Sequence, residues 1–203
     1  MRFSLILFAT IVFLSFSCKR DSNSNDRKSK DYTAQITEAL NYCKRKNLNT
    51  SFFFLLDFNT HSGLNRFHIV DFNSNRIKDS FLVSHGCGTK PWGKDGSKDN
   101  VITSNTPDSH LSSEGKYIIG ERGYSNWGLH FKYLLHGQDA TNSNALKRVI
   151  VLHSWDAISD TEIYPRGTAE GWGCPAVSNN SLKIIDNMIK SATNKKVLLW
   201  IIK

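Results

Sequence analysis

Short apolar segments separated by polar turns recur along most of this chain, and this pattern limits the folds open to it. An apolar run interrupted only at Asp57 covers residues 52–58, and segments at 67–72 and 77–83 flank the turn Asn73-Ser74-Asn75. Similar short segments, some bounded by glycine, follow at 115–119, 129–135, 148–152 and 197–202. Short apolar runs between turn residues are typical of strands. The spacing therefore predicts a mainly β, mostly antiparallel fold.

Two segments have helical periodicity instead. Residues 33–46 place Ile36, Ala39, Leu40 and Cys43 at helical spacing, so Cys43 belongs to the buried side of an amphipathic helix. Near the C-terminus, Ser178 is suited to be the N-cap of a second helix. The apolar positions of that helix are Leu182, Ile185, Met188, Ile189 and Ala192. We therefore expect an N-terminal helix, and a C-terminal helix followed by the strand at 197–202.

The composition allows one globular domain with a core of useful size. The chain has 203 residues, of which 39% are hydrophobic, so wholesale disorder and a multi-domain machine are excluded. Lys and Arg number 26 against 18 Asp and Glu, a net charge of +8. This moderate excess suits nucleic acid, anionic lipid or an acidic wall polymer equally. Charge alone therefore names no partner.

The first residues indicate export. Arg2 precedes a nearly uncharged apolar run at 5–16 that is too short to cross a bilayer, so residues 1–17 are predicted to be a cleaved signal peptide. Cys18 follows, and this junction resembles that of bacterial lipoproteins, whose cysteine is acylated. Ordinary secretion with an incidental cysteine is the alternative. Residues 18–32 then have the polar composition of a flexible tether, which would hold a domain at 33–203 near the membrane as a periplasmic lipoprotein.

A cysteine near the C-terminus stands in a turn that suits a nucleophile. Cys174 lies in Gly171-Trp172-Gly173-Cys174-Pro175-Ala176-Val177, just before the last predicted helix. Backbone N–H groups at such a turn lower a thiol pKa and can bind an oxyanion. For Cys174 alone, a small buried residue in a tight turn is an equally good interpretation.

His153 supplies the base that a thiol nucleophile needs. It ends the apolar segment 148–152, where a side chain emerges from a rigid sheet, and the loop that follows is long enough to bring Cys174 beside it. Imidazole takes the thiol proton, and thiolate is the attacking form. The backbone carbonyl of Ser154 is suited to hold the other ring nitrogen. We therefore predict a catalytic group of Cys174, His153, Ser154 and Gly173.

An earlier His–Cys motif must be weighed against this one. His68 and Ser84-His85-Gly86-Cys87 satisfy literally the pattern of YkuD-type L,D-transpeptidases, which is a His, a spacer, Ser or Thr, and then His-Gly-Cys. In that family, paired strands come first, followed by a Thr-Pro-x-Gly-like turn and a strand, and only then by the motif. Here the similar turn begins at Thr106-Pro107, after Cys87. The early match is therefore misleading.

Counting from His153 fits the family instead. Residues 154–170 separate His153 from Gly171, and Trp172-Gly173-Cys174 follow. Together with Gly-Cys-Pro-Ala-Val, Leu-His-Ser and the run at 104–107, this resembles the exported murein L,D-transpeptidase branch from about residue 36 to 203. The resemblance implies an L,D-transpeptidase-like β-sandwich or barrel with an N-terminal helix and a C-terminal helix and strand.

Two positions depart from the family pattern. Gly171 stands where the family has Ser or Thr, and Trp172 stands where it has a second His. Because an indole cannot take a proton, the base role passes to His153 alone. The residues predicted to contact substrate are Trp172, Gly171, Arg148 and His136. For Arg148 and His136, packing and a solvated strand end are the alternatives, and Trp92 and Trp127 are interpreted as core or rim packing.

The resemblance implies acyl transfer by cysteine. Cys174 would attack the carbonyl between the third residue of a peptidoglycan stem and its terminal D-Ala, and an acceptor amine would resolve the thioester. Neither a metal nor an organic cofactor is needed. The expected partners are stem peptides and, through the lipid anchor, the membrane, with no nucleic acid and a monomeric state. An L,D-carboxypeptidase or endopeptidase using the same cysteine, and a non-catalytic wall-binding lipoprotein with a decayed site, are the alternatives.

The remaining cysteines allow two further interpretations. Cys43 and Cys87 could form a disulfide, or both could stay reduced. A mixed zinc site is also conceivable, although the close-spaced cysteine pairs usual in such sites are missing. Its ligands would be His85, Cys87, His153 and Cys174.

Overall fold

The computed structural model describes residues 30–192 and 195–203. The predicted signal peptide (1–17), Cys18 and most of the predicted tether (18–32) lie outside these residues. The described fold is the compact unit Tyr32–Lys203. None of its helices is both long and apolar enough to span a bilayer, as far as the described residues show.

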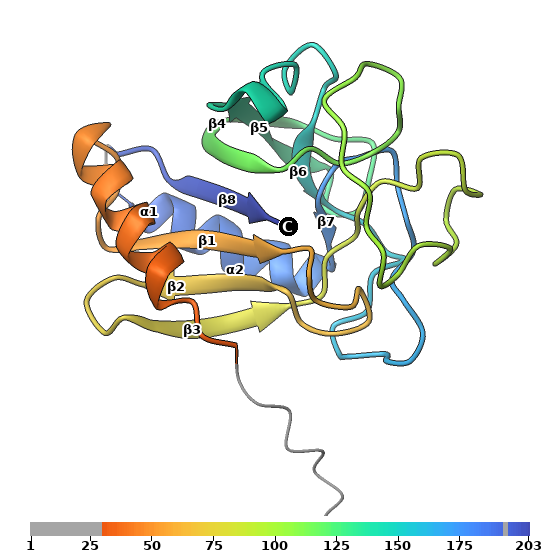
Figure 1. Ribbon diagram of the computed structural model, residues 1–203, viewed down its shortest axis with the longest axis horizontal. Coiled ribbons are helices and arrows are strands. Elements are labelled where there is room, and N and C mark those ends of the chain that lie inside the picture. Colours follow the sequence, from red (N-terminus) through yellow and green to blue (C-terminus); the bar gives the residue numbers. More distant parts are fainter. Residues whose placement is uncertain (1–29, 193–194) are drawn as a thin grey trace, which may run out of the picture. The chain divides into compact units, whose positions relative to one another are not determined.

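The fold is mainly β, with one helix before the strands and one near the C-terminus (Figure 1). The elements in chain order are α1 (Thr33–Arg45), β1 (Phe52–Asp57), β2 (Phe67–Asp71), β3 (Arg76–Phe81), β4 (Gly115–Tyr124), β5 (Phe131–Gly137), the short 3-10 helix η1 (Ala140–Asn142), β6 (Val151–Ser154), β7 (Ala176–Val177), α2 (Asn179–Ser191) and β8 (Leu198–Ile202). This confirms the predicted fold class.

The strands form one nearly closed sheet in the order β3-β2-β1-β8-β4-β5-β6-β7. Neighbouring strands are antiparallel except for the parallel pairs β1–β8 and β6–β7. The chain segment after β3 continues toward the opposite edge of the sheet, because the Ser84 N–H donates to the Ala176 carbonyl of β7 at 2.8 Å. The segment that carries the misleading motif therefore lies against the edge strand that follows Cys174.

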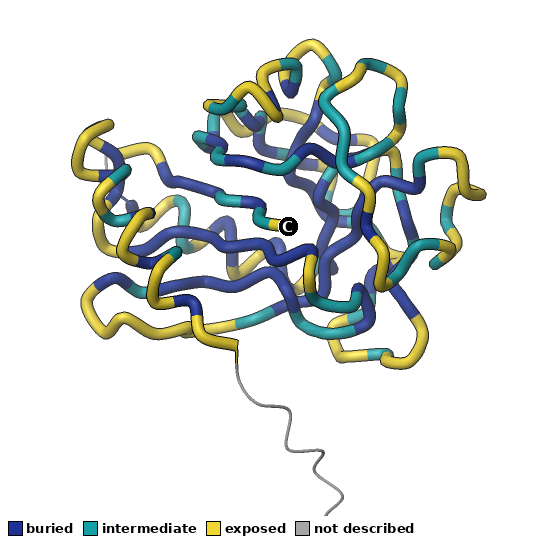
Figure 2. Tube along the Cα trace, in the orientation of Figure 1, coloured by how far each residue is buried: buried dark blue, intermediate teal, exposed yellow. Residues whose placement is uncertain are grey.

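Burial on both faces explains why the sequence of β1 is apolar without alternation. Successive side chains of a strand point to opposite faces, and both faces of β1 are covered. Phe52, Phe54 and Leu56 join the larger core, which includes α2, and Phe53 and Leu55 pack with α1 in a second core. Figure 2 shows β1 buried along its length, whereas exposed residues gather in α1 and the peripheral loops.

The two helices begin and end as their sequences suggest. Ile36, Ala39 and Cys43 are the buried residues of α1, and Lys44 and Arg45 stand in its last turn, where cations complement the helix dipole. The Ser178 side chain caps α2 by accepting from the Ser181 N–H at 3.1 Å. The predicted N-cap is therefore confirmed.

One strand starts later than its sequence indicates. Apolar content predicts a strand at 148–152, but β6 begins at Val151 and ends at Ser154. Val149 has a φ of +55°, a conformation that a β-branched residue rarely adopts and that interrupts a strand. The short strand β7 and η1 were not expected from the sequence.

Candidate active site

The turn before Cys174 depends on a glycine. Gly173 has a φ of +98°, and a Cβ atom at this position would lie 2.6 Å from the Leu111 carbonyl oxygen. Both the left-handed backbone and the close approach of Leu111 therefore require a residue without a side chain. Cys174 follows this turn and leads into β7, which pairs in parallel with β6.

The Cys174 thiol is held against the backbone before β6. Its Sγ accepts from the Val151 N–H at 3.5 Å and donates to the Val149 carbonyl at 3.6 Å. Burial raises the pKa of the thiol, while the Val151 N–H and the positive charges of Lys132 and Arg148 oppose that rise. The resting cysteine is therefore a protonated thiol.

The hydrogen bonds of His153 determine which of its nitrogens can act as a base. Nδ1 lies 3.0 Å from the Ser154 carbonyl oxygen. A carbonyl only accepts, so Nδ1 carries the proton and Nε2 keeps its lone pair. The residue is 9% exposed, and burial lowers the pKa of His153. His153 is thus a neutral imidazole with a free basic nitrogen, and Ser154 holds the ring as its position in the sequence suggests.

Cys174 and His153 line the same cleft, which has a volume of about 150 Å³. Its other lining residues are Ser84, Trp92, Trp127, Trp155, Gly171, Trp172 and Ala176. Among the described residues no hydrogen bond joins Sγ to the His153 ring: the thiol donates to the Val149 carbonyl instead. The pair is therefore a neutral thiol and a neutral imidazole in one cleft.

Tryptophan dominates the cleft walls. Four of the five tryptophans of the chain line it, and the Trp92 ring stacks on Trp155 with centroids 5.0 Å apart. Trp127 contacts both rings at 6.0 Å. Trp92 and Trp127 remain 47% and 46% exposed, so they are open to a ligand rather than buried in a core.

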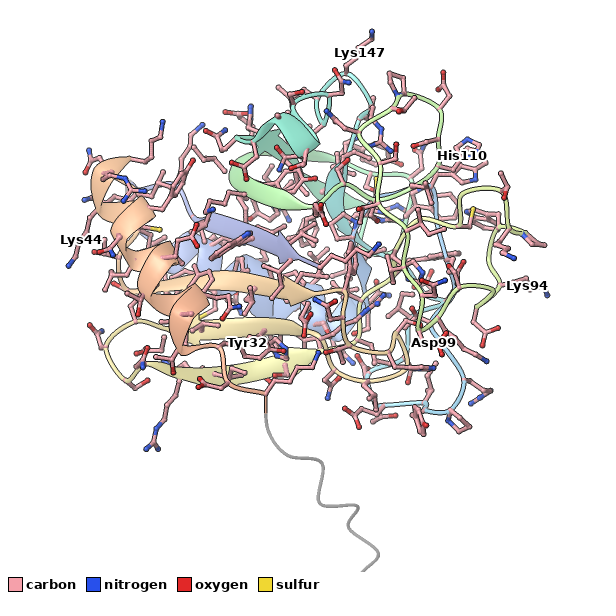
Figure 3. The ribbon with its side chains drawn as sticks, viewed as in Figure 1. Tyr32, Lys44, Lys94, Asp99, His110 and Lys147 are labelled. Atoms are coloured by element: carbon pink, nitrogen blue, oxygen red, sulfur yellow. The ribbon has the colours of Figure 1, made fainter. Side chains whose placement is uncertain are left out.

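Trp172 forms the boundary with a second hollow. It is 63% exposed, and its ring stacks on His110 with centroids 4.9 Å apart. His110, Lys147, Arg148 and Trp172 line this hollow together with Pro107, Asp108 and Val149. Figure 3 shows the Lys147 side chain extending away from the ribbon into solvent.

Three consecutive backbone N–H groups at the turn have no acceptor among the described residues. They belong to Trp172, Gly173 and Cys174. Buried backbone donors are almost always paired with protein or water, and donors without a protein acceptor beside a nucleophile are those that can stabilise an oxyanion. The turn thus offers donors to an acyl group at Cys174.

Lys132 stands next to this pair through strand register. In the β5–β6 ladder Lys132 is directly opposite His153, and directly opposite residues of an antiparallel pair share a face of the sheet. The ammonium makes no ion pair or hydrogen bond with any residue that the structure describes. Its charge lowers the pKa of both His153 and Cys174. Cys174 and His153 therefore both lie in the positive field of Lys132.

Comparison with known proteins identifies the family of the chain. The family profile of the L,D-transpeptidase catalytic domain matches residues 23–199. The chain belongs to this family. A search of curated proteins found no match.

Several solved structures resemble the chain. Bd1075 of Bdellovibrio bacteriovorus has 18% identity and a TM-score of 0.42, with 77% of this chain and 49% of that chain covered. The L,D-transpeptidase (residues 123–326) from Xylanimonas cellulosilytica has 10% identity and a TM-score of 0.40, with 75% and 60% covered. The helical cell shape determining protein Pgp2 from Campylobacter jejuni has 15% identity and a TM-score of 0.42, with 83% and 55% covered. The chain thus spans about half the length of these solved chains.

The structure distributes the predicted substrate-contacting residues of this L,D-transpeptidase domain unevenly. Trp172 and Gly171 line the cleft. His136 does not: it lies on β5, where its Nε2 is 3.4 Å from Glu121 Oε2. In the β4–β5 ladder His136 pairs with Ile118, further along β5 than Lys132, which pairs with His153 of β6. His136 is therefore not among the residues that line the cleft, and its contact with substrate stays a prediction.

Arg148 is occupied by the loop that contains residues 104–113. Its Nη1 donates to the Ser104 carbonyl at 2.7 Å and to Ser113 Oγ at 2.5 Å. Its Nη2 donates to the Leu111 carbonyl, and to Ser109 Oγ at 3.3 Å. Because these contacts occupy both terminal nitrogens, we reassign Arg148 from substrate contact to loop anchor.

The misleading motif has a structural role beside the cleft. The His85 carbonyl accepts from the Gly171 N–H, and the Cys87 N–H donates to the Gly171 carbonyl, each at 2.8 Å. Ser84 Oγ donates to the Cys174 carbonyl at 3.2 Å. Cys87 is buried, and burial raises the pKa of its thiol. The segment therefore supports the turn at residues 171–174, termed the nucleophile turn after its candidate nucleophile, Cys174.

The other interpretations of the cysteines are not supported. Cys43 and Cys87 are both free thiols, so the disulfide is absent. No group of three His, Cys, Asp or Glu residues in the described ranges is arranged to hold a metal ion, which removes the zinc interpretation.

Sequence reasoning also missed Lys132 and assigned Trp92 and Trp127 to packing. Strand register would have identified Lys132, but register is not readable from this sequence alone.

Proposed function

We propose that this protein is a cysteine-dependent peptidoglycan L,D-transpeptidase with Cys174 as nucleophile and His153 as base. The observation that carries the proposal is the shared cleft of a thiol and a neutral imidazole whose free nitrogen is Nε2. Family membership supports the same chemistry. No step requires a metal or an organic cofactor.

In the first half-reaction, Cys174 attacks the carbonyl between the third residue of a stem peptide and its terminal D-Ala. The thiol leaves the Val149 carbonyl and transfers its proton to His153 Nε2 as the C–S bond forms. The N–H groups of Gly173 and Cys174 stabilise the oxyanion, with about 3–4 kcal/mol for each well-placed donor. The C–N bond then breaks, and D-Ala departs with the proton held by His153.

In the second half-reaction, an amine from another stem attacks the thioester carbonyl. His153 takes a proton from this amine, the new C–N bond forms, and the C–S bond breaks. The proton returns to the sulfur, so Cys174 and His153 regain their starting states. Water as the acceptor would instead give carboxypeptidase activity from the same acyl-enzyme.

Incubation with a defined stem tetrapeptide and an acceptor stem, followed by mass spectrometry, tests this function. We expect a cross-linked product and free D-Ala from the wild type and from Cys87→Ala, and neither from Cys174→Ala. A hydrolysed tripeptide as the only product, even with excess acceptor, would establish the carboxypeptidase instead. Binding to purified sacculi without any product would favour a non-catalytic wall-binding protein.

We also propose that Cys18 carries lipid, and that residues 18–32 tether the domain at 33–203 to the periplasmic face of a membrane after removal of residues 1–17. The support is the apolar run before Cys18 and the polar composition after it. Stem peptides and the membrane are then the partners, with no nucleic acid and a monomeric state. Metabolic labelling with a radioactive fatty acid is expected to mark the wild type and to leave Cys18→Ser unmarked.

A further inference from the structure

The peptide bond between Gly173 and Cys174 is fixed from one side only. It is a trans bond, because the cis bond of the described chain is Tyr164–Pro165. In a planar trans peptide the carbonyl and the following N–H point in opposite directions. Whatever fixes the Gly173 carbonyl therefore also aims the Cys174 N–H.

Ser112 fixes that carbonyl. Its Oγ donates to the Gly173 carbonyl at 3.0 Å and accepts from the Gly86 N–H at 3.1 Å. Because the Gly86 N–H occupies a lone pair of the hydroxyl oxygen, the hydroxyl proton is directed to Gly173. Ser112 is 1% exposed and lies outside the cleft lining. The carbonyl thus points into the protein, and the unpaired Cys174 N–H points the other way.

We infer that Ser112 is a positioning residue for acyl transfer: its hydroxyl holds the Gly173 carbonyl and thereby aims the Cys174 N–H at the oxyanion. This inference rests on the proposed function, because it requires an oxyanion to form at Cys174. Ser112 touches neither substrate nor the reacting atoms. It acts through one peptide plane.

The loop that carries Ser112 is itself fixed by Arg148. The guanidinium donates hydrogen bonds to both neighbours of Ser112, to the Leu111 carbonyl and to Ser113 Oγ. It also donates to the Ser104 carbonyl, while the Ser104 N–H donates to the Ser112 carbonyl at 2.8 Å. Arg148 therefore acts on the nucleophile turn indirectly, by fixing the position of Ser112.

Ser62 provides a control that is as buried as Ser112 but does not bond to the turn. It is 0% exposed, and its Oγ accepts from the Thr168 N–H at 3.2 Å. It is not among the residues that line the cleft. Loss of the Ser62 hydroxyl therefore removes a buried hydrogen bond without releasing an oxyanion donor.

The test compares two reactions of the same sulfur. Acylation by a carbapenem forms an oxyanion, whereas alkylation by iodoacetamide does not, so the ratio of the two rates isolates the oxyanion donors. We expect Ser112→Ala to lower this ratio at least about tenfold, since loss of a donor costs about a hundredfold or more. Alkylation should change little, Ser112→Thr should restore the ratio, and Ser62→Ala should leave it at the wild-type value.

A wild-type ratio in Ser112→Ala, or an equal fall in Ser62→Ala, would overturn the inference. If Ser112→Ala does not fold, Arg148→Gln replaces it, and there too an unchanged ratio would contradict the role of the loop. A wild type that is alkylated but never acylated would instead refute the proposed function itself.

Discussion

At the scale of single residues, the positive charge of Lys132 is the feature of the site most open to measurement. Burial raises the pKa of the Cys174 thiol, and the Lys132 ammonium is one of the groups that oppose this rise. Removing the ammonium in Lys132→Met should raise the thiol pKa. The rate of iodoacetamide alkylation, followed against pH, should then rise at higher pH than in the wild type.

An exposed lysine of α2 gives the control for that experiment. Lys183 lies exposed on α2, and no Coulombic contribution from it acts on Cys174 or His153. Lys183→Met removes the same net charge and should leave the alkylation profile in place. Equal profiles for Lys132→Met and the wild type would show that the sulfur does not sense Lys132.

At the scale of elements, substitution of the two glycines of the nucleophile turn should affect the free energy of unfolding to different extents. A Cβ at Gly171 would meet only Trp155 Cζ3 at 4.0 Å, whereas one at Gly173 would lie 2.6 Å from a backbone oxygen at a positive φ. Gly173→Ala should therefore lower the free energy of unfolding by at least about 1–3 kcal/mol. Gly171→Ser should stay within about 1 kcal/mol of the wild type.

Urea unfolding measures both variants. Similar losses of unfolding free energy in the two variants would mean that the turn relaxes around an added side chain.

The comparison also bears on function, because Gly171 stands where the family has Ser or Thr. The open space at Gly171 means that a serine there would fit the cleft wall, so its absence is not forced by packing.

Strand positions were more predictable than their exact ends. The run at 52–58 predicts β1 because seven consecutive positions carry mostly apolar side chains. The start of β6 was missed by three residues, since apolar content alone cannot show that Val149 adopts a positive φ. Local composition thus locates an element, and the backbone conformation of single residues sets its boundary.

At the scale of the whole molecule, a buried cluster under the nucleophile turn should make the fold sensitive to acid. Arg66, His85 and Glu170 are all 0% exposed. Arg66 Nη2 donates to His85 Nδ1 at 2.9 Å, and Nε2 of the same His85 ring lies 3.0 Å from Ser97 Oγ. Glu170 Oε1 is also 3.6 Å from Nε2, but burial, together with the Arg66 charge, lowers the pKa of His85 from 6.5 to about 3. The imidazole is therefore neutral.

Stability should then fall as the pH falls below about 6.5. The unfolded chain protonates His85 near pH 6.5, but the folded chain does so only near 3. Above pH 6.5 the neutral His85 makes its full contribution to the free energy of unfolding. As the pH falls from 6.5 toward about 3, this contribution decreases by up to about 1.4 kcal/mol per pH unit. His153, whose pKa is also lowered by burial, acts in the same direction.

Urea unfolding between about pH 7.5 and about pH 4.5 checks this effect. His85→Gln cannot take up a proton, so its stability should depend less steeply on pH than that of the wild type, although it begins lower. Parallel curves for the two proteins would contradict a neutral buried His85.

The whole-molecule arrangement explains which parts of the site were readable from the sequence. Cys174 and His153 belong to one local motif whose spacing is visible, and Ser154 follows His153 directly. Lys132, Trp92 and Ser112 reach the site from other parts of the chain, through register, loop path and closure of the sheet. These depend on tertiary packing, which leaves no local pattern in the sequence.

Peptide mapping after reaction with a carbapenem tests the central claim most directly. Limiting reagent should acylate one cysteine of the native protein, and digestion should place the added mass on the peptide that contains Cys174. His153→Ala should slow this reaction greatly while leaving the site of attachment unchanged. Added mass on Cys87 or Cys43, or acylation at the wild-type rate without His153, would contradict the account.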